Sequence, residues 1–257
     1  MPAPRKSVSA PTLPPQVSFK PEFVKLGDKV HRGISLIIYS DPGIGKTTLA
    51  ATLPPDETLI VNVEAGIGPL LGKGHSVFYL QRDLMQLEEL YRYLRTEKHP
   101  FKYIVIDNIS ELEQWIIEVL RTGRGKDFPE LAEYGDAASK MREYLHKFRD
   151  LTEQGLTVVI NAWEMNVDLK NSGGEVLTKT SPKMFKKLVP DACGIVDMVG
   201  HLECWEKTGD RWVRFHPLKN LIAKTQFKGI DECEPADLVK ILEKVYTFDY
   251  KGEVNGG

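Results

Sequence analysis

Short runs of apolar residues alternate along the chain with stretches whose apolar residues recur at helical spacing. The runs are nearly continuous Ile, Val and Leu, as expected of strands buried on both faces of a parallel sheet. The predicted strands cover residues 34–39, 58–63, 76–80, 103–107 and 156–161. The first predicted helix begins at Thr47, and the others cover residues 83–98, 110–120 and 131–154. This alternation predicts an α/β fold with a mostly parallel central sheet flanked by helices.

The pattern changes after Trp163, where residues 168–181 form a polar stretch. Two shorter strands are predicted at 195–204 and 211–216, and the turn residues 207–210 between them favour a C-terminal antiparallel hairpin. A last amphipathic helix is predicted at 235–244. Residues 1–22 are rich in Pro, Ser and Ala and are expected to form a flexible arm. The predicted organisation is this arm, an ATPase domain at 23–232, and a C-terminal helix and tail at 233–257.

A phosphate-binding motif lies between the first predicted strand and the helix that follows it. It reads Ser40-Asp41-Pro42-Gly43-Ile44-Gly45-Lys46-Thr47-Thr48. The motif matches G-x-x-x-x-G-K-[ST] except that Ser40 replaces the first Gly, and a small residue there is compatible with the turn. Backbone N–H groups of residues 43–47 are expected to cradle the β-phosphate of ATP, with Lys46 at the β/γ oxygens and the Thr47 hydroxyl on Mg²⁺. The alternative is an unrelated Gly-rich loop.

Two acidic residues end predicted strands. Asp107 follows the buried run 103–106 and is predicted to hold Mg²⁺ through water, although Asp is also common where a strand merely passes into a loop. Asn108, and not a second acid, follows Asp107. The carboxylate that orients the attacking water is therefore sought at Glu64, which ends the strand after the P-loop helix. A loop or helix-capping acid is the alternative for Glu64.

At Glu64 the sequence resembles the RecA-like ATPases, whose catalytic Glu lies at the end of the strand after the P-loop helix. Residues 158–161 resemble the fourth core strand of that family, which ends in a polar residue that senses the γ-phosphate, here Asn161. Trp163 and Glu164 stand where related phage proteins often carry a His-Glu pair. A Trp that packs beneath the sheet is the alternative for Trp163.

Residues 221–227 resemble the segment from which RecA-like subunits project a basic finger onto a neighbour's nucleotide. Lys224 would be this finger, and Gln226 stands where an Arg is often found. From residue 34 to 229 the order of these elements resembles the phage nucleotide-binding proteins, including RecA-like single-strand annealing proteins. The resemblance implies ATP, Mg²⁺, single-stranded DNA, and self-assembly into a ring or filament, with a single-stranded DNA-binding protein as a further partner. It implies DNA-stimulated ATP hydrolysis in phage recombination or annealing.

Charge limits where DNA can bind. The net charge of −2 and the pI of about 6.3 provide no global basic field, so a DNA site must be a local patch. Five lysines flank or fill the polar stretch, with Met184 and Phe185 between the last of them. They are Lys170, Lys179, Lys183, Lys186 and Lys187. A basic loop with an aromatic residue can track phosphates and stack a base, and solvated surface lysines are the equal alternative.

Composition bears on the redox state of the cysteines, on the cellular location and on the rival functions. Cys193, Cys204 and Cys233 are too far apart for a CxxC pair and are expected to be reduced thiols. The apolar runs are too short for a membrane helix and the N-terminus lacks a signal-type region, so we expect a protein of the (host) cytoplasm without membrane contact. Two rivals stay open. A P-loop kinase would need an Arg-rich lid, for which residues 121–126 are the nearest candidate, and a nucleotide-dependent adaptor would bind a protein without turning over ATP.

Overall fold

We analysed a computed structural model, which describes residues 32–64, 66–170 and 174–247. The predicted N-terminal arm and the end of the predicted tail lie outside the described residues. The strands of the described residues form one nine-stranded sheet. The strands are β1 (Ser35–Ser40), β2 (Thr58–Asn62), β3 (Ser76–Tyr79), β4 (Tyr103–Asp107), β5 (Thr157–Lys170), β6 (Val176–Pro182), β7 (Met198–Cys204), β8 (Arg211–Arg214) and β9 (Cys233–Pro235).

The central sheet is mostly parallel. Its order is β3-β2-β4-β5-β1-β7-β8-β9, and the pairs from β3 to β7 are all parallel. Strand β8 pairs antiparallel with β7 and with β9, and β6 pairs antiparallel with the outer part of β5. The predicted α/β fold, with its parallel sheet and C-terminal antiparallel hairpin, is confirmed.

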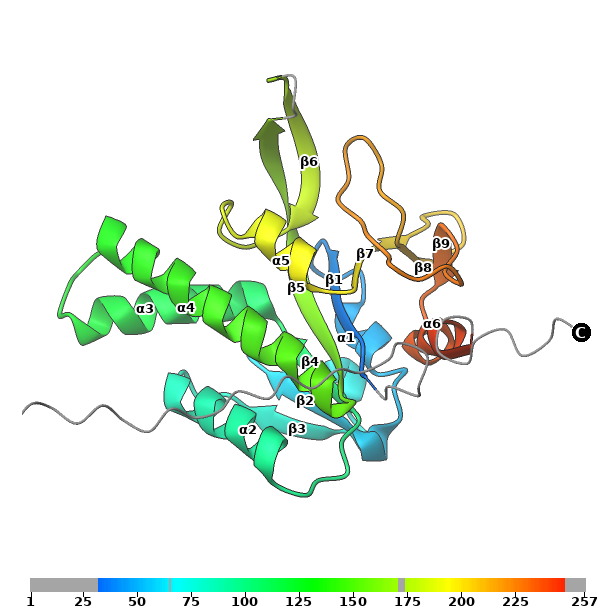
Figure 1. Ribbon diagram of the computed structural model, residues 1–257, viewed down its shortest axis with the longest axis horizontal. Coiled ribbons are helices and arrows are strands. Elements are labelled where there is room, and N and C mark those ends of the chain that lie inside the picture. The colour runs from blue at the N-terminus through cyan, green and yellow to red at the C-terminus, as the bar shows by residue number, and fades with distance from the viewer. Residues whose placement is uncertain (1–31, 65, 171–173, 248–257) are drawn as a thin grey trace, which may run out of the picture. The chain divides into compact units, whose positions relative to one another are not determined.

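Helices cover both faces of the sheet (Figure 1). The α-helices are α1 (Lys46–Ala50), α2 (Leu84–Thr96), α3 (Ile109–Gly123), α4 (Leu131–Asp150), α5 (Val189–Ile195) and α6 (Leu238–Val245), with 3-10 turns η1 (Pro55–Glu57), η2 (Gly68–Leu70) and η3 (Leu151–Gln154). Helices α2, α3, α4 and α5 contribute to the apolar cluster on one face, and α1 and α6 contribute to the cluster on the other. Successive residues of each central strand point to opposite clusters. The continuous Ile/Val/Leu runs follow from this burial on both faces.

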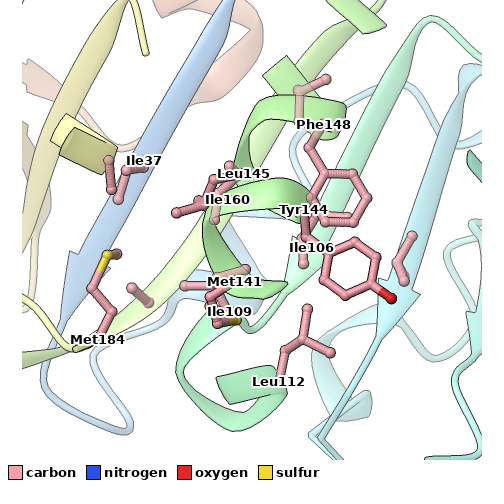
Figure 2. Packing of buried hydrophobic residues seen from close by; sticks show 14 of the residues in the cluster. Ile37, Ile106, Ile109, Leu112, Met141, Tyr144, Leu145, Phe148, Ile160 and Met184 are labelled. Carbon is pink, nitrogen blue, oxygen red and sulfur yellow. The ribbon is translucent and has the colours of Figure 1, made fainter. Parts of the chain in front are cut away.

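The larger cluster packs α3 and α4 onto the middle of the sheet (Figure 2). Tyr144 and Phe148 of α4 stack with ring centroids 6.3 Å apart, and Ile106 and Ile160 of the central strands are fully buried beneath these helices. This packing buries the middle of the sheet next to Asp107, where β4 ends. No helix in the described part of the chain is long and apolar enough to cross a membrane.

The structure differs from the prediction mainly after Asn161. Strand β5 does not end there but continues to Lys170 and forms a ribbon with β6 that extends beyond the central sheet (Figure 1). In the ribbon, Val167 is buried while Asn166 and Asp168 are exposed, so the segment alternates instead of forming an apolar run. Its polar composition therefore concealed a strand. Helix α5 and strand β9 were also missed, and α6 begins at Leu238, three residues later than predicted.

Candidate nucleotide-binding site

The predicted site residues meet at the carboxyl-terminal edge of the parallel strands. Register places Asn62 beside Asp107 and Ile38 beside Asn161. Because parallel strands end on the same side of a sheet, the loops after β1, β2 and β4 converge there, and α/β proteins commonly bind ligands at such an edge. The P-loop, Glu64, Asp107 and Asn161, which are spread over more than a hundred residues of sequence, thus share one site.

The P-loop joins β1 to α1, as predicted. Gly43 and Gly45 have φ angles of 84° and 116°, a region that favours glycine. Helix α1 begins without a side-chain cap, which leaves its first backbone N–H groups available to a ligand. The Lys46 side chain folds over the loop, where Nζ donates to the Ser40 carbonyl at 3.0 Å, to Ser40 Oγ at 3.1 Å and to the Asp41 carbonyl at 3.0 Å.

Lys46 carries its charge in a buried position, with a relative exposure of 6%. Burial lowers the pKa of Lys46, and the negative charges of Glu64 and Asp107 oppose that change. The acids face the ammonium group across the loop, so their electrostatic effect helps keep Lys46 charged. The Lys46 ammonium and the Glu64 carboxylate therefore both line the space above the loop, with Asp107 nearby.

A chain of hydrogen bonds connects the P-loop to two strand ends. Thr47 Oγ1 donates to Asp107 Oδ2 at 2.7 Å, and Asn161 Nδ2 donates to Asp107 Oδ1 at 3.1 Å. Both carboxylate oxygens of Asp107, which is only 3% exposed, are thus engaged. A hydroxyl and a carboxylate are oxygen ligands of the kind that Mg²⁺ prefers, so the donor set fits this ion. The structure brings the two predicted Mg²⁺ residues into direct contact and the predicted sensor beside them.

Glu64 lies half-buried at the end of β2, next to this chain. Burial and the neighbouring Asp107 charge raise the pKa of the Glu64 carboxyl, and Asn108 and Lys46 oppose the change. Asn108 Nδ2 is close enough to Glu64 to affect its pKa, yet it is buried without a hydrogen bond of ordinary geometry in the described structure. The other end of the Asn108 side chain caps α3, where Oδ1 accepts from Glu111 N at 2.9 Å.

An open pocket of about 420 Å³ lies over the P-loop. It is lined by Pro42, Gly43, Gly45, Lys46, Thr47, Thr48, Glu64, Gly66, Pro69 and Trp163. Trp163 forms one wall of the pocket, so the alternative in which it packs beneath the sheet is wrong. The Lys183 ammonium lies over the Trp163 ring, 4.9 Å from its centroid, a cation–π contact that joins the pocket wall to the segment after β6.

Two further side chains at this edge were missed by sequence reasoning. His201 of β7 bridges two acids, with Nε2 at 2.9 Å from Glu164 Oε2 and Nδ1 at 3.2 Å from Glu203 Oε1. Arg211 of β8 donates from Nε to the Ile44 carbonyl of the P-loop at 2.6 Å. The contacts of His201 with Glu164 and of Arg211 with Ile44 belong to no local motif, since each forms only through the pairing of strands: β5, β1 and β7 for His201, and β1, β7 and β8 for Arg211.

Lys224 lies away from the pocket. Its Nζ donates to the carbonyls of Cys193, Gly194 and Val196, at 3.2, 2.8 and 2.6 Å. These carbonyls lie at the C-terminal end of α5, where a cation is electrostatically favoured. Burial lowers the pKa of Lys224. To act as a finger on a neighbour's nucleotide, Lys224 would have to leave these three acceptors, so the finger stays a prediction.

The segment after β6 carries part of the candidate DNA patch. Lys186 and Lys187 are exposed, and the Lys170 side chain lies outside the described residues. Met184 is 2% exposed and Phe185 packs partly against the larger core cluster. Phe185 is only partly buried, so stacking of its ring on a base stays a prediction.

A buried carboxylate, that of Glu113, accepts a hydrogen bond from the backbone of this segment. Glu113 of α3 is 6% exposed and accepts a hydrogen bond from Phe185 N at 2.5 Å. Burial raises the pKa of Glu113 to about 7, against its ordinary value of 4.5. Because the folded state binds this proton more tightly, its contribution to stability is full below pH 4.5 and is lost as the pH rises through 7.

Glu113→Gln is expected to remove this pH dependence while keeping an acceptor for Phe185 N. Relative to the parent, the free energy of unfolding of the variant should rise between pH 4.5 and 8 by about 3 kcal/mol. Urea unfolding at several pH values measures this difference. The interpretation is wrong if the two proteins differ by the same amount at every pH.

The chain is similar to one protein family and to solved structures. The AAA domain family matches residues 32–227 of the chain. No curated protein sequence matches it. Among solved structures, the crystal structure of the RadB recombinase is similar at a TM-score of 0.47 and 15% identity, covering 72% of this chain and 84% of that chain. With a family match over most of its length and a P-loop at the edge of a parallel sheet, this chain belongs to the AAA domain family.

Proposed function

We propose that this protein hydrolyses MgATP in response to single-stranded DNA, in phage recombination or strand annealing. The observation that carries the DNA part is the contact between Lys183 and Trp163. Trp163 is a wall of the P-loop pocket, and Lys183 belongs to the segment that presents Lys186 and Lys187 to solvent. A strand of DNA on these lysines would therefore act on a segment that already contacts the nucleotide pocket.

The hydrolytic roles follow from charge and position. Lys46 would neutralise charge on the β/γ-phosphate oxygens, where a preorganised cation stabilises the transition state most. Glu64 would orient the attacking water and accept its proton, and Asn161 would hold Asp107 in place and contact the γ-phosphate. Thr47 and Asp107 would hold Mg²⁺, which supplies a counter-charge for the phosphates when bound. Each role uses a group that the fold places at the same edge of the sheet.

The DNA interface would combine the β5–β6 ribbon with the lysines that follow it. The ribbon extends beyond the sheet and carries Lys179, and the segment after it carries Lys183, Lys186 and Lys187. Because Phe185 packs partly against the core, binding by this surface would rest mainly on phosphate contacts. Weak sequence preference and strong salt dependence are the expected properties of such a site.

Lys186→Ala/Lys187→Ala is expected to keep basal ATP turnover and lose stimulation by single-stranded DNA. The slope of log affinity for DNA against log salt concentration should become shallower by about 1.4, since each lost phosphate contact on a single strand contributes about 0.7. ATPase assays with and without an oligonucleotide, and DNA titrations at several salt concentrations, measure both quantities. The matched control is Lys98→Ala/Lys207→Ala, which removes the same charge from two exposed sites outside this surface.

The same assays test the whole proposal. Parent protein that turns over ATP equally with and without DNA would overturn the DNA role, and protein that binds ATP without turnover would indicate the nucleotide-dependent adaptor. A P-loop kinase finds little support, because the basic residues proposed for its lid form ion pairs with acids of the same chain. Arg121 pairs with Glu118, and both Arg124 and Lys126 pair with the buried Glu133. Self-assembly, implied by the family resemblance, remains part of the proposal.

A further inference from the structure

The antiparallel hairpin of β7 and β8 contacts the P-loop through Arg211. Arg211 Nε lies 2.6 Å from the Ile44 carbonyl, and the two residues are 167 positions apart in sequence. The same side chain lies against Gly45, where an added Cβ would stand 2.9 Å from Arg211 Nε and 3.4 Å from Cζ. Gly45 also has a φ of 116°. Arginine and loop can approach this closely because residue 45 has no side chain.

This contact determines the direction of one peptide group. In a planar trans peptide the C=O and the following N–H point to opposite sides. When Arg211 holds the Ile44 carbonyl on the side of the loop that faces β8, the N–H of Gly45 is directed away from Arg211, and the pocket over the loop is lined by Gly45 and Lys46 but not by Arg211. We infer that Arg211 is a positioning residue that preorganises the Ile44–Gly45 peptide for phosphate binding. This inference rests on the proposed binding of nucleotide phosphates by the loop.

The remaining contacts of β8 show that Arg211 differs from its neighbour. Arg214, three residues along, forms ion pairs with Glu203 and Glu232. In the part of the chain that the structure describes, Arg211 has no carboxylate within ion-pair distance, and its side chain is exposed. Its charge is therefore not neutralised locally and adds to the positive potential beside a loop that would receive an anion.

The test compares nucleotide affinity and kinetics in variants at this position. Arg211→Ala should weaken binding of a fluorescent ADP analogue by about 10-fold or more, the scale for loss of a charge-assisted hydrogen bond. KM for ATP should rise by a similar factor with kcat within about 2-fold of the parent, because a contact that positions the loop acts on ground and transition states alike. Arg211→Lys, which retains a cation and a donor, should recover part of the affinity. Lys207→Ala, in the turn of the same hairpin, controls for the change in charge.

The outcomes separate this inference from the proposed function. If the parent fails to bind the analogue, the proposed function falls; Lys46→Ala binding less tightly than the parent supports it. If the parent binds and Arg211→Ala binds equally well, the inference falls alone. A variant that melts at lower temperature yet keeps the parent's affinity and KM would make Arg211 a structural link between β8 and the loop, which also overturns the inference. Should Arg211→Ala not fold, equal KM in Arg211→Lys and Arg211→Gln would overturn it.

Discussion

Lys46→Ala is expected to abolish measurable ATP turnover and leave the fold intact. Among the described residues, Lys46 Nζ donates to oxygens of Ser40 and Asp41, six and five positions away, so its removal breaks no contact with a distant part of the chain. In the complex with ATP, the same ammonium would face the phosphates, where its loss should cost about 10²- to 10³-fold or more in kcat. Steady-state ATPase assays, with circular dichroism and thermal unfolding on the same samples, measure both parts of the expectation.

A second variant separates charge from packing at this position. Lys46→Met keeps most of the buried stem but removes the cation, so it should lose turnover to the same extent as Lys46→Ala. Lys207→Ala removes an exposed cation elsewhere and should retain the parent rate. Hydrolysis at the parent rate by purified Lys46→Ala would show that this loop is not the phosphate site.

Glu64→Gln is expected to bind MgATP and turn it over slowly, by a factor of about 10² to 10⁴ for loss of a general base. Asp107→Asn should fail differently. Its carboxylate accepts from Thr47 and Asn161, so the amide should raise the Mg²⁺ concentration needed for half-maximal activity. Nucleotide affinity, kcat and the Mg²⁺ dependence, measured on both variants, separate a base from a metal ligand.

Nearby acids supply the controls for Glu64. Glu111 accepts from the Trp115 indole N–H at 3.0 Å and Glu164 contacts His201, so both carboxylates already have partners. Glu111→Gln and Glu164→Gln should therefore retain more activity than Glu64→Gln. If Glu64→Gln works at the parent rate, the base lies elsewhere, and whichever of the other two variants is inactive would identify it.

Much of the fold was predictable because its signals are local. A strand buried on both faces must be apolar throughout, and a helix with one buried face has apolar residues every three to four positions. Both patterns can therefore be recognised within a short stretch of sequence. The P-loop can be recognised for the same reason, because Gly43, Gly45 and Lys46 all belong to one short loop. Asp107 was predicted as the acid that ends a second buried strand after the P-loop, and Glu64 was predicted as a strand-end acid through the resemblance to the RecA-like ATPases.

The ribbon and its surroundings were not predictable in this way. Strand β5 continues past Asn161 as an alternating strand, and its formation there depends on pairing with β6, whose partner residues lie 6 to 18 positions further along the chain. Phe185 was one candidate for stacking on a base, and in the structure it packs partly against the core. Glu113 and Ser110 of α3 bind the backbone around it, with Ser110 Oγ donating to the Lys183 carbonyl at 2.7 Å. Composition alone does not distinguish these two environments for an aromatic side chain.

Local sequence patterns were enough to predict the fold class and the phosphate loop, whereas the distant groups that contact this loop are known only from the assembled sheet. Asp107 lies 60 residues from Thr47 and Arg211 lies 167 residues from Ile44, and each pair meets through strand order and register. Lys224 was placed by the same kind of contact, on the carbonyls at the end of α5. The physical reason is that local pattern reports burial and backbone preference, which act within a few residues, while hydrogen bonds between elements depend on how the whole sheet is assembled.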